Sequence, residues 1–277
     1  MTFEEKAFER FKEQILRDGP RLGLDDRFRF ECHRKLECFN HCCHDVNIFL
    51  TPYDIIRIKN RLRLTSGDFL GRHCIIPLSK NMKYPIVMLK MNDDEQVSCP
   101  FLEVPNGCSI YEDRPWSCRM YPLGRAAPPE RVGGQDTPFY FLLHDDFCRG
   151  HEQTSQWTVF EWLDNQGVGE YNEAARFFQQ IVQDDRLGGE TELSPQQMDM
   201  LFMVCYDLDR FRRFVFATEF LNMFQIAQET IESIRANDVE LLQLGFDWLL
   251  FALWKEPALK IRDEVVQARL AHTGTTP

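Results

Sequence analysis

The sequence predicts an α+β protein in which helices predominate. An irregular cysteine-rich, metal-binding domain with short strands is expected over residues 1–150, followed by an acidic helical domain over residues 151–277. Nine of the ten cysteines lie in the first part. The first part carries 22 Lys and Arg against 22 Asp and Glu, whereas the second carries 10 against 21, so the acidic excess lies in the second part. Apolar residues also recur at helical spacing after about residue 152.

The cysteine-rich part begins with two predicted helices. Phenylalanine and aliphatic residues recur at helical spacing over residues 2–18. The segment "LTPYDIIRIKNRL" predicts a second helix over residues 50–62. Thr51 is a favourable N-cap, Pro52 suits the first helical position, and Asp54 completes a T-x-x-D capping box.

Short strands and turns are predicted next. The apolar segments 84–91 and 96–102 are typical of strands, and the polar residues 92–95 between them predict a hairpin turn. Residues 109–123 predict a turn with one or two helical turns. The segment 137–145 is a further strand candidate.

The second part is predicted to consist of helices. Thr154 or Ser155 is expected to cap the first of them, which ends at Gly167, and Ser194 and Asp238 are expected to begin later ones. The predicted helices cover residues 154–167, 169–189, 194–216, 238–254 and 256–270.

Composition predicts a cytoplasmic protein. The segment "MTFEEKAFERFKEQILRD" lacks the basic and apolar regions of a signal peptide. No stretch reaches the roughly 18 apolar residues of a membrane span, and the richest one, 241–254, is interrupted by Asp247. Disulfides are disfavoured in the cytosol, so clustered thiols there indicate metal binding or redox chemistry. The acidic helical part does not suit nucleic acid; we interpret it as a solvated surface that could contact a protein partner.

The cysteines are concentrated in two groups of segments. The first holds a double cysteine in "ECFNHCCHDVNIFL". The second is spread over turns rich in Pro and Gly, which can bring sulfur atoms together around one ion and expose backbone N–H groups that stabilise thiolates. The candidate ligands are Cys32, Cys38, Cys42, Cys43, Cys99, Cys108, Cys118 and Cys148.

The number of sites stays open at this point. Eight thiols could supply two four-sulfur sites, and a single site would combine either member of the double cysteine with Cys99, Cys108 and Cys118. Adjacent side chains diverge in a regular element, so both members can serve one centre only on a bent backbone. Cys74 is either a ligand or a core residue, and Cys205 lies on an apolar helix stripe that favours the core.

Two arginines, Arg114 and Arg119, bracket Cys118. Their charge could favour the thiolate and balance an anionic centre. They could equally form ordinary ion pairs with Glu112 or Asp113.

Two segments carry a resemblance to a known family. "CFNHCCHDVNIFLTPYDIIRI" is followed by "CPFLEVPNGCSIYEDRPWSCRMYPL". Together they resemble the CxxCxxCC family, also called the YkgJ-type cysteine-cluster or zinc- or iron-chelating domain. The resemblance covers roughly residues 30–150 and implies metal chelation. The family's name pattern is C-x2-C-x2-C-C, whereas this chain has Cys38-x3-Cys42-Cys43 with Cys32 further upstream.

The thiols suit either a 4Fe–4S iron–sulfur cluster or zinc. We therefore expect a metal-binding protein. One alternative is a lysine N-methylase that uses S-adenosylmethionine, because flagellin lysine N-methylases contain a similar cysteine cluster; no cofactor loop for it is recognisable. A second alternative is a metal chaperone or store, which would hold its metal in a labile, exposed site.

Overall fold

The computed structural model describes residues 20–77, 83–126, 139–184, 186–187 and 193–273. The structure is 49% helix and 12% strand, which confirms the predicted α+β class with helices predominating. The helix predicted over residues 2–18 lies outside the described residues.

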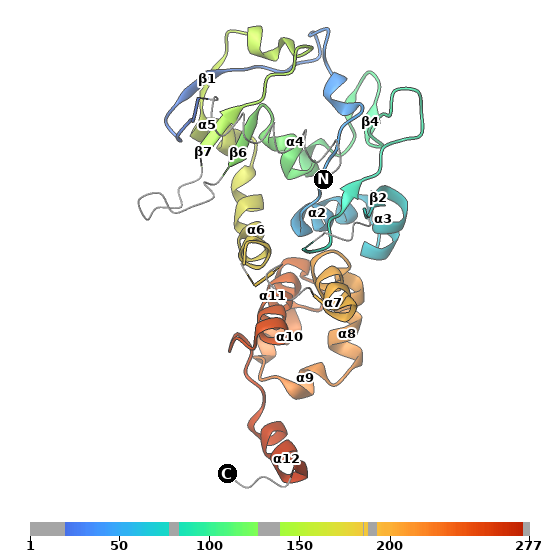
Figure 1. Ribbon diagram of the computed structural model, residues 1–277. Helices are drawn as coiled ribbons and strands as arrows, with labels where there is room; N and C mark the ends of the chain where they lie inside the picture. Colours follow the sequence, from blue (N-terminus) through green and yellow to red (C-terminus); the bar gives the residue numbers. More distant parts are fainter. Residues whose placement is uncertain (1–19, 78–82, 127–138, 185, 188–192, 274–277) are drawn as a thin grey trace.

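Short strands are interspersed with helices of one to three turns in the first part of the chain (Figure 1). The elements before residue 159 are β1 Arg27–Arg29, η1 His41–Cys43, α2 Pro52–Leu62, α3 Ser66–His73, β2 Cys74–Ile75, β3 Met88–Leu89, β4 Leu102–Glu103, β5 Gly107–Cys108, η2 Tyr111–Asp113, α4 Trp116–Met120, β6 Leu123–Ala126, β7 Phe139–Leu142, η4 Arg149–Glu152 and β8 Gln156–Thr158. Helices follow: α5 Val159–Asn165, α6 Val168–Val182, α7 Pro195–Cys205, α8 Leu208–Ala217, α9 Phe220–Met223, α10 Gln228–Ser233, α11 Asp238–Trp254 and α12 Asp263–Thr273.

The strands of the described residues form four antiparallel pairs: β1 with β8, β2 with β3, β4 with β5, and β6 with β7. The predicted hairpin joining 84–91 to 96–102 is therefore wrong. Asp94 accepts hydrogen bonds from the backbone N–H groups of Gln96 (3.1 Å) and Ser98 (2.9 Å), which bends the chain sharply there. As a result β3 pairs with β2 instead, and β4 forms a hairpin with β5.

Three helix boundaries also differ from the prediction, each because of a contact with a distant segment. Thr158 caps α5, because the residues just before it pair with β1. The predicted helix 194–216 is two helices, because Asp207 interrupts it. The Asp207 carboxylate accepts a hydrogen bond from the Ser66 hydroxyl at 2.6 Å and caps the start of α8. The last helix begins at Asp263 rather than 256, because residues 260–262 run beside 223–225, with the Gln225 N–H donating to the Lys260 carbonyl at 2.8 Å.

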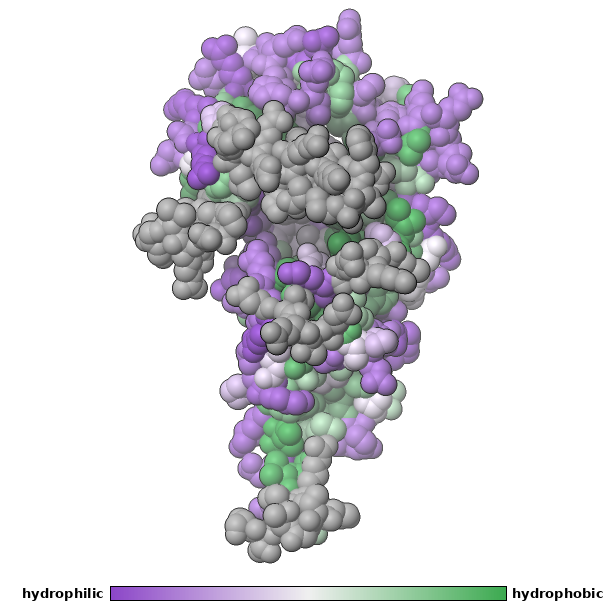
Figure 2. Space-filling model, in the orientation of Figure 1, coloured by the Kyte–Doolittle hydropathy of each residue, from purple (hydrophilic) through white to green (hydrophobic). Residues whose placement is uncertain are grey.

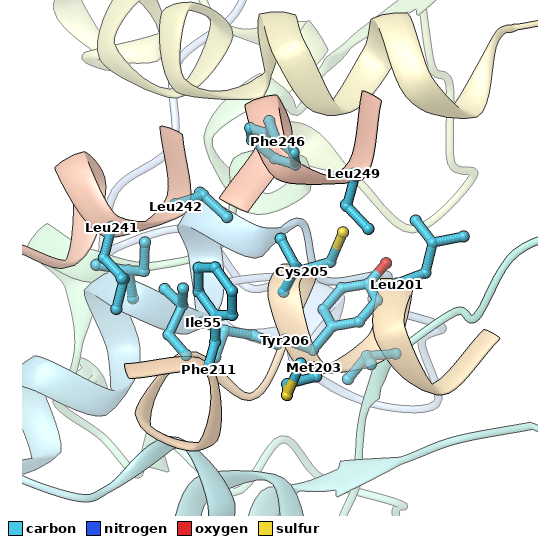
Figure 3. Close-up of a cluster of buried hydrophobic side chains, with 14 of the residues drawn as sticks. Ile55, Leu201, Met203, Cys205, Tyr206, Phe211, Leu241, Leu242, Phe246 and Leu249 are labelled. Atoms are coloured by element: carbon cyan, nitrogen blue, oxygen red, sulfur yellow. The ribbon is translucent and has the colours of Figure 1, made fainter. Parts of the chain in front are cut away.

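Two apolar clusters form the core. One joins β1, α4, β6, β7 and α5 through Phe28, Phe30, Met120 and Trp162. The other joins α2 and α3 to the later helices; Figure 3 shows Ile55 of α2 among side chains of α7, α8 and α11. This cluster takes residues from both sides of residue 150, and the division into two domains at that position stays a prediction.

Helix α2 is the element that connects the cysteine-rich segments with the later helices. Thr51 and Asp54 form the predicted capping box at its start. Near its end Lys59, whose side chain is 6% exposed, pairs with Asp238 at 2.9 Å and Asp209 at 3.5 Å. The helix therefore joins a capped N-terminus, close to the cysteine segments, to a buried ionic network on α8 and α11.

Candidate metal centre

The double cysteine lies in the single-turn helix η1. The backbone is left-handed on both sides of it, with φ of 69° at Asn40 and 48° at Asp45. The Cys43 thiol hydrogen-bonds the Cys42 sulfur, which lowers the pKa of Cys42 to about 7 against the opposing effect of burial. The same bond and burial raise the pKa of Cys43. This is the bent backbone on which two adjacent cysteines can serve metal chemistry.

Backbone contacts bring Cys99 to the double cysteine. The Cys99 N–H donates to the Cys43 carbonyl at 2.8 Å, and the Asp45 N–H donates to the Val97 carbonyl at 3.0 Å. Figure 1 shows the segment after β1 crossing the end of the molecule toward the part that carries β4. The β4–β5 hairpin then returns the chain so that Cys108 lies opposite Leu102. Cys99 thus meets the double cysteine through backbone hydrogen bonds, and the β4–β5 hairpin brings Cys108 close enough to Cys99 for its charge to raise the pKa of that thiol.

Backbone N–H groups are directed at both of these sulfur atoms. The Phe101 N–H hydrogen-bonds the Cys99 thiol, although burial is the larger effect and raises the pKa of Cys99 to about 11. The Ile110 N–H does the same for Cys108, whose pKa is also raised mainly by burial. Each donor lies two residues after its cysteine, and such N–H groups stabilise a thiolate once it forms.

Helix α4 supplies Cys118. Asp54 is fully buried, and one of its oxygens accepts the Trp116 N–H at 2.7 Å while the other accepts the Thr51 N–H and hydroxyl at 2.7 and 2.8 Å. The cap of α2 therefore also fixes the start of α4. The surrounding protein atoms, which displace part of the solvent around this exposed residue, followed by the charges of Cys99 and Cys108, raise the pKa of Cys118 to about 12. We call Cys43, Cys99, Cys108 and Cys118 the hairpin group.

Cys42 is close enough to Cys99 and Cys118 for its charge to raise their pKa values, and it also lies near the remaining candidates, Cys32, Cys38 and Cys148. The Arg149 N–H donates to the Cys38 sulfur at 3.2 Å, and the Glu31 N–H donates to the Gly150 carbonyl at 3.1 Å. Burial, then the charges of Cys42, Cys38 and Cys148, raises the pKa of Cys32 to about 11. We call Cys32, Cys38, Cys42 and Cys148 the strand group, because the pairing of β1 with β8 brings its ends together. Cys74 and Cys205 are buried in the apolar core.

The comparison with known families gives one match, to the cysteine-rich part of the chain. Residues 31–149 match the family model described as "CxxCxxCC: Putative zinc- or iron-chelating domain". The match supports a general metal-binding role. No curated protein and no solved structure shows significant similarity to the chain.

The thiols of residues 31–149 are accessible but are not placed around a common point. Cys32, Cys42 and Cys118 are exposed, and the other five candidates are partly exposed. Within the described residues, no three His, Cys, Asp or Glu side chains are already placed to hold a metal ion. Binding a metal would therefore require the sulfur atoms to move closer together. No helix in the described part of the chain is long and apolar enough to cross a membrane.

Two buried arginines bracket Cys118 of the hairpin group in the sequence. Arg114 and Arg119 are each 7% exposed. The Arg114 guanidinium donates to the Tyr111 carbonyl at 2.6 Å, and that of Arg119 donates to the Arg114 carbonyl at 3.1 Å and to the Gln166 carbonyl at 2.7 Å. Their charges also act on acidic groups, that of Arg119 on Asp54 and that of Arg114 on Glu112, while Arg114 is close enough to Cys108 and Cys118 to balance part of their thiolate charge.

Sequence reasoning missed one member of this arrangement. Asp54 was expected only as a capping residue, yet it also holds the segment that carries Cys118. The T-x-x-D pattern predicts one use of the carboxylate. The second use depends on a partner 62 positions away, and the sequence contains no signal for it.

Proposed function

We propose that the hairpin group binds one metal centre through four thiolates, as an iron–sulfur cluster of the 4Fe–4S type. The same four soft ligands also suit a tetrahedral zinc ion. The observation that carries the proposal is the approach of Cys99 to Cys43 through a backbone hydrogen bond and of Cys108 to Cys99 through the β4–β5 hairpin, with an N–H group directed at two of the three sulfur atoms.

The charges around the hairpin group support the same conclusion. Four thiolates carry four negative charges, which iron or zinc only partly neutralises, so a stable centre benefits from nearby positive charge and from hydrogen-bond donors. Arg114 is close enough for its charge to lower the pKa of Cys108, although burial raises that pKa by more. The protein thus provides both kinds of compensation on the buried side of the group.

The test is to purify the full chain without a tag under anaerobic conditions and to measure its visible spectrum with iron, sulfide and zinc content. A brown protein with equal iron and sulfide is expected, with about four of each bound by the one hairpin group of each chain. A colourless protein with stoichiometric zinc would overturn the cluster and retain the thiolate site. A protein without stoichiometric metal would overturn the proposal.

A matched pair of variants tests the ligand assignment. Cys108→Ser removes a partly exposed thiol of the hairpin group, whereas Cys205→Ser changes a buried thiol of the helical core. We expect Cys108→Ser to lose the metal of this group and Cys205→Ser to retain it. Circular dichroism of both variants would show whether a loss of metal reflects misfolding. Full metal content in a folded Cys108→Ser variant would contradict the assignment.

The exposed thiols favour a second candidate, a metal chaperone or store. A metal held by exposed ligands is open to attack by a competing ligand, and Cys118 of the hairpin group is exposed. Transfer to a colorimetric chelator under anaerobic conditions separates the two functions. Release within seconds to minutes would favour the chaperone, and retention over hours would favour a resident centre.

A further inference from the structure

Three positions in the stretch 31–42 contact residues 147–150. The Arg149 N–H donates to the Cys38 sulfur at 3.2 Å, which places Cys38 beside Cys148. Glu31, the residue before Cys32, donates its backbone N–H to the Gly150 carbonyl at 3.1 Å. His41, the residue before Cys42, has its ring centroid 4.4 Å from the ring centroid of Phe147. Each of the three cysteines is thus fixed, directly or through a neighbour, to the segment that carries Cys148.

A buried hydroxyl also lies at this place without a partner. The Tyr121 hydroxyl is buried and is among the described side-chain atoms that have no hydrogen-bond partner. The neighbours of this hydroxyl are the side chains of Cys148 and Asp145. A thiolate at Cys148 would give this donor an acceptor, which is the kind of partner that a buried hydroxyl requires.

We propose that Cys32, Cys38, Cys42 and Cys148 form a second thiolate metal centre, joined to the centre of the hairpin group by the Cys42–Cys43 peptide bond. The proposal rests on the proposed function, because it assumes that thiols of this chain bind metal at all. It assigns one member of the double cysteine to each centre and so explains why two cysteines stand side by side on a bent backbone.

The two groups differ in what surrounds them. The hairpin group has two buried arginines that bracket Cys118 in the sequence. The strand group instead has the Arg149 N–H at Cys38 and the Tyr121 hydroxyl near Cys148, with the carboxylate of Asp145 close by. The Arg149 guanidinium also interacts with Cys38, but it is exposed and paired with Glu152, so the strand group has less buried positive charge to balance its thiolates. We expect the strand group to release its metal more readily than the hairpin group when a chelator is added.

The experiment counts metal per chain in the full-length protein and in variants of each group. The wild type is expected to hold two centres. Cys38→Ser and Cys148→Ser are each expected to hold one, as is Cys108→Ser from the hairpin group. Cys74→Ser, which changes a buried core thiol, is the control and keeps two. Circular dichroism and the metal remaining in the other group show that each variant is folded.

The outcomes separate this inference from the proposed function. One centre in the wild type, lost in Cys108→Ser and unchanged in both Cys38→Ser and Cys148→Ser, would overturn the second centre and leave the first. One centre lost in all three variants would show that the eight thiols serve a single site, which also overturns the inference. A wild-type protein without stoichiometric metal would overturn both.

Discussion

Sulfur occurs in two contrasting environments in this molecule. Cys205 is 1% exposed and lies in α7 among apolar side chains, and burial raises the pKa of its thiol. Cys42 is exposed, in a tight turn whose contacts are mainly backbone hydrogen bonds. On the face drawn in Figure 2, hydrophilic residues predominate at the end of the molecule that carries β1 and β4, while hydrophobic residues gather along the later helices.

The comparison shows two ways of holding a chain in place. The helices gain stability by removing apolar surface from water, which requires no additional ligand. The turns that carry the thiols bury only isolated apolar side chains, such as Phe101 and Ile110, and ordering the turns costs conformational entropy that these side chains and a few backbone bonds offset in part. A metal bound by several turns at once would supply the missing stabilisation.

Metal removal is expected to have the largest effect and to act on one environment only. After chelation, the amides of Cys43, Cys99 and Ser109 should exchange with solvent on the order of 100-fold faster, because the turns that fix them lose their cross-link. Amides in the middle of α11 should keep their protection. Hydrogen exchange with mass spectrometry measures both in one sample. Equally faster amide exchange in the two environments would contradict the proposed difference in how they are stabilised.

The contrast also explains what the sequence could predict. Thr51 with Asp54, and Ser194 before Pro195, identified the starts of α2 and α7, because a helix cap is formed by residues within one turn of each other. All eight candidate thiols were also recognisable from their clustering. Their roles as ligands stay a prediction, as do a protein partner for the acidic helices and a methylase activity.

Features that depend on distant contacts were not predictable. The meeting of Cys32 with Cys148 follows from the pairing of β1 with β8, two three-residue strands more than 120 positions apart. Such short strands have little periodicity, and nothing in the sequence indicates their partners. For the same reason the number of thiols predicts enough ligands for two sites, but the sequence does not indicate to which group each thiol belongs.

The ionic network between α2 and the later helices offers the next largest effect. Lys59→Ala would remove the partner of Asp238 at 2.9 Å and of Asp209 at 3.5 Å in a buried position. We expect a loss of about 3 kcal/mol in the free energy of unfolding, because buried carboxylates lose part of their compensation. Urea unfolding followed by circular dichroism measures it.

Arg72→Ala is the matched control for Lys59→Ala. Its ion pair with Asp68 spans 3.5 Å between side chains that are 62% and 48% exposed. Solvent screens such a pair, so the expected loss is below about 0.5 kcal/mol. Similar losses for the two variants would show that the buried network does not connect the two parts energetically.

The carboxylate of Asp54 tests the support of the thiol segments themselves. Asp54→Ala leaves the backbone N–H groups of Thr51 and Trp116 without their acceptor, at an expected cost of about 2 kcal/mol. Asp68→Ala removes the acceptor of the Thr65 hydroxyl (2.7 Å) at an exposed position, where water can replace it, and should cost at most about 1 kcal/mol. Urea midpoints compare the two. We expect only Asp54→Ala to weaken metal retention by the hairpin group; equal retention in both variants would contradict its positioning role.

Glycines in two helices provide the smallest and most local test. A Cβ at Gly245 of α11 would lie 2.5 Å from Val204 Cγ1 and 3.1 Å from Phe211 Cε1, whereas one at Gly169 of α6 would meet nothing within 4 Å. Gly245→Ala should therefore lose about 1 kcal/mol, because overpacking the core outweighs the better helix propensity of alanine. Gly169→Ala should gain about 0.5 kcal/mol from that propensity alone. Neither change lies near the thiols, so metal content should stay at the wild-type value while the unfolding midpoints move in opposite directions. A gain in stability for Gly245→Ala would mean that the helical core is packed less tightly than its contacts indicate, and the contrast with the cysteine-rich turns would weaken accordingly.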